Sequence, residues 1–76
     1  MRDQVVQIIA EVLSVDVMSL TDELSIGDIP QWSSMAQMNL IATLEKRLEI
    51  EFPIEDLFDL TSVGAIVAEI EKVKNA

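Results

Sequence analysis

The strongest constraint on the fold of this chain is the helical spacing of its apolar residues, which recurs in three separate stretches. The stretches cover about residues 2–13, about residues 34–49, and a C-terminal segment that Thr61 or Ser62 can cap. Their apolar positions are Val5, Ile8, Ile9, Val12 and Leu13, then Leu40, Ile41, Leu44 and Leu48, and finally Val63, Ile66, Val67, Ile70 and Val73. Each set falls on one face of a helix, so three helices can bury these faces against one another.

A fourth, shorter helix is expected between the second and third stretches. Pro53 moves Phe52 out of helical conformation, and residues 54–60 then allow about two helical turns. Gly64, in the first turn of the last helix, is expected to let a neighbouring segment approach closely. We therefore predict an all-α fold: a four-helix bundle with three longer helices, one short third helix and a long loop between helices one and two.

Composition limits the chemistry of the chain. Its 76 residues have the size of one domain, so we expect residues 1–76 to form a single unit, and a hydrophobic fraction of 50% is ample for a packed core. Cys and His are both absent, which removes disulfides, thiolate metal sites and the imidazole base. No calcium loop is predicted either, because residues 22–30 lack the ligand spacing that such a loop requires.

The chain is strongly acidic, with fourteen acids against five bases and a net charge of −9. Such a chain repels nucleic acid and anionic membrane surfaces, and a basic patch is the natural complement on a protein partner. The simpler alternative is that the acidity only keeps a small domain soluble. No N-terminal apolar run is long enough for a signal peptide or a membrane span, so a cytoplasmic location is expected.

Residues 14–32 have no sustained period, yet they do not resemble a plain linker. Turn-forming residues are interspersed with apolar ones such as Leu20 and Trp32, and a disordered linker would not carry so much apolar surface. We predict a long loop held against the core by these side chains, with a short helical turn near residues 21–24. Loops of this length in compact domains are often functional, and this one leads to Ser34.

The helix at residues 34–49 carries a second apolar strip, formed by Met35, Met38 and Ala42, about 100° or more away from its core face. Two explanations are open at this point. The methionines either touch the long loop, or they form an exposed contact surface beside Ser34. Methionine side chains adapt to several partners, which suits the second explanation.

Ser34 stands at the start of this helix, where the helix dipole favours an anion. A serine in such a place is most often a simple helix cap. A hydrolase with Ser34 as its nucleophile would need a base, and Lys46, twelve residues further on, lies about 18 Å away along the helix axis. We therefore do not predict an enzyme.

The surroundings of Ser34 match a known attachment motif, usually Asp-Ser-Leu or Asp-Ser-Met at the start of a second helix. The matching positions are Trp32, Ser33-Ser34-Met35, residues 36–41, Leu44-Glu45, Phe52-Pro53 and residues 60–63. The length, the acidity and the helix order fit as well. Over essentially its whole length, the chain resembles the acyl and peptidyl carrier proteins.

The resemblance implies that Ser34 carries a covalent 4′-phosphopantetheine arm, transferred from coenzyme A by a phosphopantetheinyl transferase. The thiol of the arm holds an acyl or aminoacyl group as a thioester, and a stand-alone, monomeric carrier moves it between loading and acyl-using enzymes with basic docking patches. The docking residues expected on this basis are Met35, Met38, Ala42 and Glu45. Ser33 is assigned to the helix cap and is the second choice for attachment.

Two departures from the family pattern sharpen this expectation. Ser33 replaces the usual Asp, which keeps a capping side chain but removes a negative charge that the transferase would recognise. Gln37 and Asn39 stand where carriers of fatty-acid synthases place acids. We therefore expect a specialised carrier of a secondary-metabolite, polyketide, peptide or surface-polymer pathway rather than the housekeeping fatty-acid carrier. The alternative is a degenerate carrier, a small acidic helical module that binds partners without covalent modification.

Overall fold

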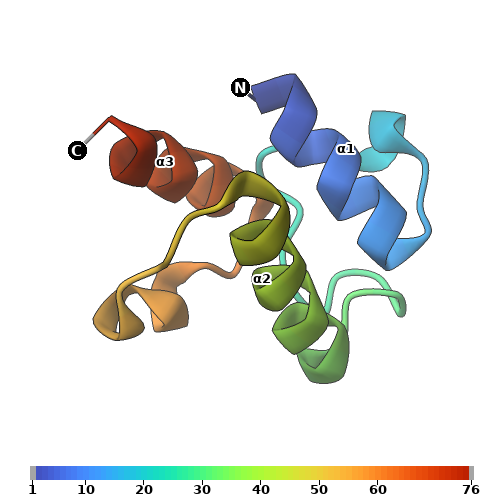
Figure 1. Ribbon diagram of the computed structural model, residues 1–76. Coiled ribbons are helices and arrows are strands. Elements are labelled where there is room, and N and C mark those ends of the chain that lie inside the picture. Colours follow the sequence, from blue (N-terminus) through green and yellow to red (C-terminus); the bar gives the residue numbers. More distant parts are fainter. Residues whose placement is uncertain (1, 76) are drawn as a thin grey trace.

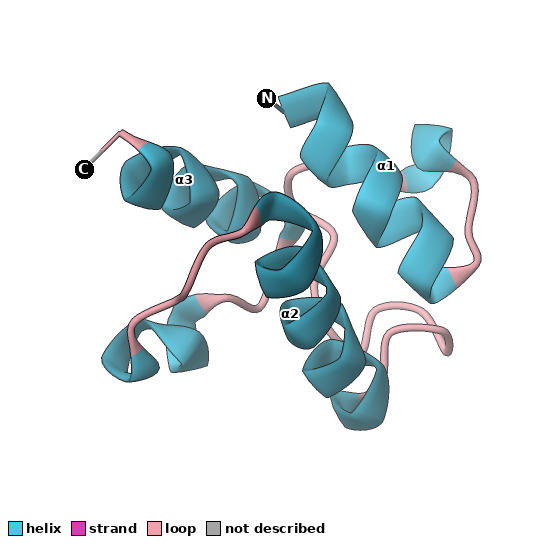
Figure 2. Ribbon diagram, viewed as in Figure 1, coloured by secondary structure: helices cyan, strands magenta, loops and turns pink. Residues whose placement is uncertain are grey.

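The computed structural model describes residues 2–75, and within them three α-helices are joined by segments that contain two 3₁₀ helices (Figures 1 and 2). In chain order the elements are α1 (Arg2–Leu13), η1 (Val17–Ser19), α2 (Ser34–Leu48), η2 (Ile54–Asp59) and α3 (Val63–Lys74). Residues 2–75 contain no β-strand. The predicted all-α bundle, with its long first loop and short third helix, is confirmed.

The core lies where the apolar faces of the three α-helices meet, and α1 packs more extensively on α2 than on α3 (Figure 1). Six of its fully buried aliphatic side chains are Val5, Ile9, Leu40, Leu44, Ile66 and Ile70. Burying one such side chain stabilises the fold by about 1.5–3 kcal/mol. Three of the predicted core positions, Val12, Ile41 and Val73, lie at the edge of the core and are only half-buried.

The long loop contains a helical turn, but not where the sequence predicted it. The turn is η1, and it begins where the Asp16 carboxylate accepts a hydrogen bond from the backbone N–H of Met18 at 2.9 Å. The expected helical turn at residues 21–24 is a single hydrogen-bonded turn, in which Leu24 N–H donates to the Thr21 carbonyl at 3.1 Å. Residues 17–19 and residues 21–24 have similar composition, and the Asp16 cap favours a helix in the earlier segment.

The second half of the loop is hydrogen-bonded to the start of α3. Ile26 N–H donates to the Thr61 carbonyl at 2.8 Å, and Gly64 N–H donates to the Asp22 carbonyl at 3.0 Å. A Cβ at Gly64 would lie only 3.2 Å from that same carbonyl oxygen, so the close approach expected at this glycine is present. Ser62 caps α3 by accepting a hydrogen bond from Ala65 N–H at 3.2 Å.

α2 ends one residue earlier than predicted, at Leu48, because Glu49 adopts a left-handed conformation with φ 55°. The chain then passes through Phe52 and Pro53 into η2, which has 3₁₀ rather than α-helical hydrogen bonding. In Figure 1, α2 runs between α1 on one side and η2 on the other. The start of α2, with its two serines, therefore lies at one end of the bundle next to the long loop.

Candidate functional site

Ser33 and Ser34 hold different positions at the start of α2. Ser33 precedes the helix in extended conformation, and its Oγ accepts a hydrogen bond from the backbone N–H of Ala36 at 3.2 Å, which makes Ser33 the N-cap. Ser34 is the first residue of the helix and is exposed to solvent. Its hydroxyl therefore stands at the positive end of α2 and is open to solvent.

Trp32 fixes the chain immediately before the two serines. Its side chain is fully buried, and its indole N–H donates to the Gln37 side-chain oxygen at 2.7 Å. Its backbone carbonyl accepts a hydrogen bond at 2.9 Å from the N–H of Gly27, a residue with φ +88° that favours glycine. The position of Ser34 is thus set from both sides, by α2 and by an anchored loop.

The methionine strip of α2 is exposed. Met35 and Met38 are 81% and 74% accessible, and Ala42 is exposed as well. The long loop therefore does not cover the two methionine side chains, which favours the explanation of an exposed surface beside Ser34. Glu45 differs from the others, because it is half-buried and its carboxylate accepts a hydrogen bond from Phe52 N–H at 2.9 Å.

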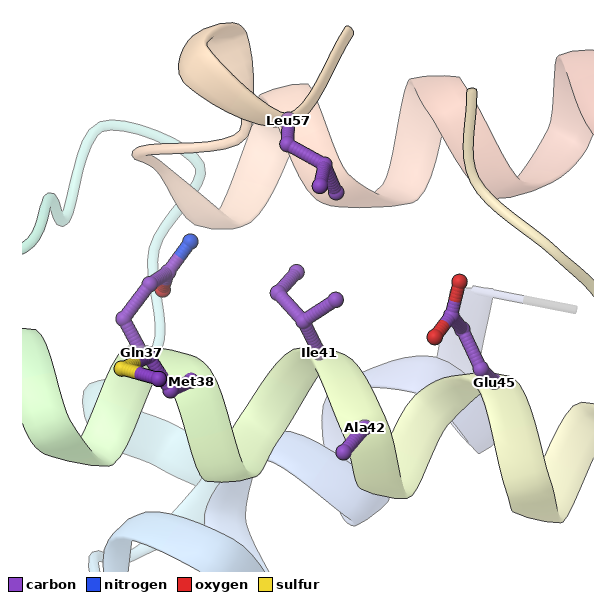
Figure 3. Close-up of a pocket in the computed structure, with 6 residues that line it drawn as sticks. All are labelled: Gln37, Met38, Ile41, Ala42, Glu45 and Leu57. Carbon is purple, nitrogen blue, oxygen red and sulfur yellow. The ribbon is translucent and has the colours of Figure 1, made fainter. Parts of the chain in front are cut away.

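A groove of about 360 Å³ runs between α2 and η2 (Figure 3). It is lined by Gln37, Met38, Ile41, Ala42, Glu45 and Leu57. Ile41 and Leu57 point toward each other across it, while Gln37 and Glu45 extend toward η2 on either side of Ile41 (Figure 3). Three of the lining residues, Met38, Ala42 and Glu45, were predicted from the sequence to lie at a docking surface. Leu57 was not predicted, because its place opposite Ile41 depends on the path of the chain after Pro53.

Charge is distributed unevenly along α2. Residues 34–44 contain no charged side chain, although the chain as a whole has a net charge of −9. Further along, Arg47 forms an ion pair with Glu11 of α1. The first three turns of α2, which begin at Ser34, are therefore uncharged. Lys46 lies about 18 Å from Ser34 along one continuous helix, too far to act as its base.

One carboxyl group departs from ordinary titration behaviour. Burial, and secondarily the neighbouring Asp56 carboxylate of η2, raises the pKa of Glu69 on α3 above its ordinary value of 4.5. One of its oxygens, Oε2, is buried without a hydrogen-bond partner. Lys72 of α3, whose Nζ lies 3.7 Å from Asp56 Oδ2, partly opposes the shift. This group belongs to the boundary between η2 and α3 rather than to the surface around Ser34.

Residues 2–75 place no three or more acidic side chains where they could hold a metal ion together. None of the helices in this range combines the length and the apolar character needed to cross a membrane.

An exposed serine that opens the second helix of a small bundle is the arrangement of a carrier domain. The sequence matches the family described as the phosphopantetheine attachment site, over residues 3–70. The chain therefore belongs to this family of carrier proteins, which includes the acyl carrier proteins, and its cofactor is a covalently bound 4′-phosphopantetheine.

Comparison with individual proteins agrees with this family. The solution structure of a holo acyl carrier protein from Geobacter metallireducens has a TM-score of 0.85 and 34% sequence identity, covering 97% of this chain and 85% of that one. Meromycolate extension acyl carrier proteins of Mycobacterium tuberculosis and Mycobacterium bovis are 30% identical over 70 residues, or 92% of this chain. The chain spans 61% of the length of these mycobacterial relatives.

Proposed function

We propose that Ser34 is the attachment serine and that the chain carries an acyl or aminoacyl group, as a thioester on its arm, between biosynthetic enzymes. The observation that carries this proposal is the difference between the two serines. The Ser33 oxygen is engaged as the helix cap, whereas the Ser34 side chain is exposed at the first position of α2. In the family motif, too, the attachment serine is the one that directly precedes Leu or Met.

The modification itself is a phosphoryl transfer. The Ser34 oxygen attacks the phosphorus of coenzyme A that bears the pantetheine, a new P–O bond forms, and 3′,5′-ADP leaves with the electrons of the broken diphosphate bond. The serine proton goes to a base on the transferase. The resulting phosphodiester stands at the positive end of α2, which stabilises its negative charge.

We further propose that the chain acts as a carrier and not as an enzyme. The partners are the transferase and the enzymes that load and use the cargo, with Met35, Met38, Ala42 and Glu45 at the docking surface. The exposure of both methionines supports this role, while the acidity of the rest of the chain suits basic patches on the partners. Fast, weak contacts suit a monomeric carrier that visits several enzymes in the cytoplasm.

The pathway we propose is a specialised one. Gln37 and Asn39 replace the acids of fatty-acid synthase carriers, and two similar proteins bear the description of meromycolate extension carriers. We propose that residues 1–76 form one carrier domain.

Intact-mass measurement tests the proposal. After incubation with coenzyme A and a broad-specificity transferase, the chain should gain the mass of one phosphopantetheine, and Ser34→Ala should abolish the gain while Ser33→Ala retains it. The alternative, a degenerate carrier without the arm, is favoured by the absence of the usual Asp before Ser34. An unchanged mass, in protein from its native cell and after treatment with an active transferase, would establish that alternative.

A further inference from the structure

Gln37 is hydrogen-bonded to three other residues around the start of α2. Its backbone N–H donates to the Ser33 carbonyl at 2.9 Å, within the first turn of the helix. Its side-chain Oε1 accepts from the Trp32 indole N–H at 2.7 Å, and its Nε2 donates to the Leu60 carbonyl oxygen at 2.5 Å. Gln37 therefore holds both residues that directly precede Ser34, and it joins them to the segment that leads into α3.

The indole N–H of Trp32 depends on Gln37 for its hydrogen bond. The Trp32 side chain is fully buried, and the acceptor of its N–H is Gln37 Oε1. A buried donor without an acceptor is costly, because it has given up its hydrogen bond to water and gained none in return. Without the Gln37 oxygen, the indole must move to reach water or another acceptor. Ser34 lies only two residues further along the chain, so such a movement displaces it as well.

The first turn of α2 needs contacts from outside the helical ladder. The first four N–H groups of an α-helix have no partner within the helix, and helix ends fray. Ser33 Oγ satisfies one of these groups in α2, the N–H of Ala36, at 3.2 Å. The bond between Trp32 and Gln37 spans the whole turn, from two residues before Ser34 to three residues after it. This bond therefore limits how far the turn can open.

We propose that Gln37 is a positioning residue for the attachment reaction, because its side-chain bond to Trp32 holds the first turn of α2 in the conformation that presents the Ser34 hydroxyl. The inference rests on the function proposed above, in which the Ser34 oxygen attacks the phosphorus of coenzyme A. That attack requires the oxygen in line with the bond that breaks. A chain in which the turn opens spends less time in the reactive conformation, and it is modified more slowly.

Substitutions of Gln37 and Trp32 separate the two side-chain bonds of Gln37. Gln37→Met removes both bonds, whereas Gln37→Glu keeps the acceptor for Trp32 and loses only the donor to Leu60, because a carboxylate can only accept. Trp32→Phe removes the indole N–H, which is the other partner of the same bond. The double variant Trp32→Phe/Gln37→Met tests whether the two side chains act as a unit. Asn39→Asp controls for the charge added in Gln37→Glu, since Asn39 is an exposed residue of α2.

Two measurements are made on each variant of the whole chain. Hydrogen exchange of the unmodified chain, followed by NMR, reports whether the start of α2 opens, and the indole signal is unambiguous because the sequence contains one tryptophan. Initial rates of phosphopantetheine transfer, at several concentrations of the chain, give kcat and KM with an active transferase. The rates are measured well below the Tm of each variant. A variant that is only less stable overall then remains folded, and it keeps the parental kcat.

We expect kcat to fall roughly three- to tenfold in Gln37→Met and in Trp32→Phe, as the loss of one hydrogen bond implies, while KM stays close to that of the parent because the docking residues are unchanged. The double variant should fall no further than the single variants. In Gln37→Met, exchange should rise at the Trp32 indole and at the N–H of Gly27, which donates to the Trp32 carbonyl, but not in α1. Gln37→Glu and Asn39→Asp should keep a kcat close to that of the parent.

Parental kcat in both Gln37→Met and Trp32→Phe would overturn the proposal, and so would additive losses in the double variant. An equal fall of kcat in Gln37→Glu would assign the effect to the bond with Leu60 and would overturn it as well. If Gln37→Met does not fold, Trp32→Phe tests the same bond. A parent chain that stays unmodified, while the same transferase modifies a second carrier protein, would instead overturn the proposed function. The exchange measurements would still show whether Gln37 holds Trp32.

Discussion

Replacing each of the two adjacent serines by alanine should separate stability from modification. In Ser33→Ala the backbone N–H of Ala36 loses the oxygen that lies 3.2 Å away, and loss of such an N-cap costs about 1 kcal/mol. In a domain of this size, a loss of about 1 kcal/mol lowers Tm by about 4–8 °C. Ser34→Ala removes an exposed hydroxyl and introduces a better helix former, so stability should stay within about 0.5 kcal/mol of the parent.

Urea unfolding, followed by far-UV circular dichroism, measures the stability of each variant. Mass spectrometry after treatment with transferase and coenzyme A measures whether the variant is modified. Ser33→Ala should be less stable but still modified, whereas Ser34→Ala should be as stable as the parent but unmodified. Ser33→Asp is the matched control, because it keeps the cap and adds a charge that the helix dipole stabilises by about 0.3–1 kcal/mol. It should also be modified faster, since it restores the family motif. Equal stability of the two alanine variants, or loss of modification in Ser33→Ala, would refute the assignment of roles.

Three further substitutions test other parts of the structure. Met38→Asp should leave helical circular dichroism unchanged, because Met38 is 74% exposed, but should slow transfer by a docking enzyme; loss of helicity would instead place Met38 in the core. Glu69→Gln should remove a pH dependence of the free energy of unfolding. The folded chain holds the Glu69 proton more tightly than the unfolded chain does. The parent therefore loses stability as pH rises from about 4.5 through the raised pKa of Glu69. The difference in Tm between variant and parent should therefore grow from about pH 4 to about pH 7, and a constant difference would contradict the shift. Gly64→Ala should destabilise the chain by about 1–2 kcal/mol in urea unfolding, despite the better helix propensity of alanine, because its Cβ would lie 3.2 Å from the Asp22 carbonyl oxygen; a gain in stability would show that the loop moves aside freely.

Local sequence patterns predicted the helices well, because the residues that determine each helix lie within or next to that helix. The apolar period of α1 and the serine that caps α3 can both be read from a few neighbouring residues. The position of η1 could not be read in this way. Residues 21–24 and residues 17–19 have similar turn-forming neighbours, and the Asp16 side chain, by bonding to Met18 N–H, favours the earlier segment.

Long-range contacts explain most of what the sequence did not reveal about the site. Gln37 was noted only as a departure from the family, yet its amide bonds both to Trp32 and to Leu60, which lies 23 residues beyond Gln37. Glu45 was assigned to docking, and its carboxylate in fact holds Phe52 N–H as well. Such bonds depend on how α2 and η2 meet, which no helical period encodes. The sequence offered one signal for such long-range bonds, which is a polar side chain placed between the core face and the exposed strip of α2.

Localisation of the modification by tandem mass spectrometry tests the central claim most directly. The chain is treated with coenzyme A and an active transferase, and the peptide that contains both Ser33 and Ser34 is fragmented. The structure and the family motif together predict one phosphopantetheine, carried by Ser34. A phosphopantetheine on Ser33, or an unmodified peptide when the same transferase fully modifies a second carrier protein, would contradict the claim.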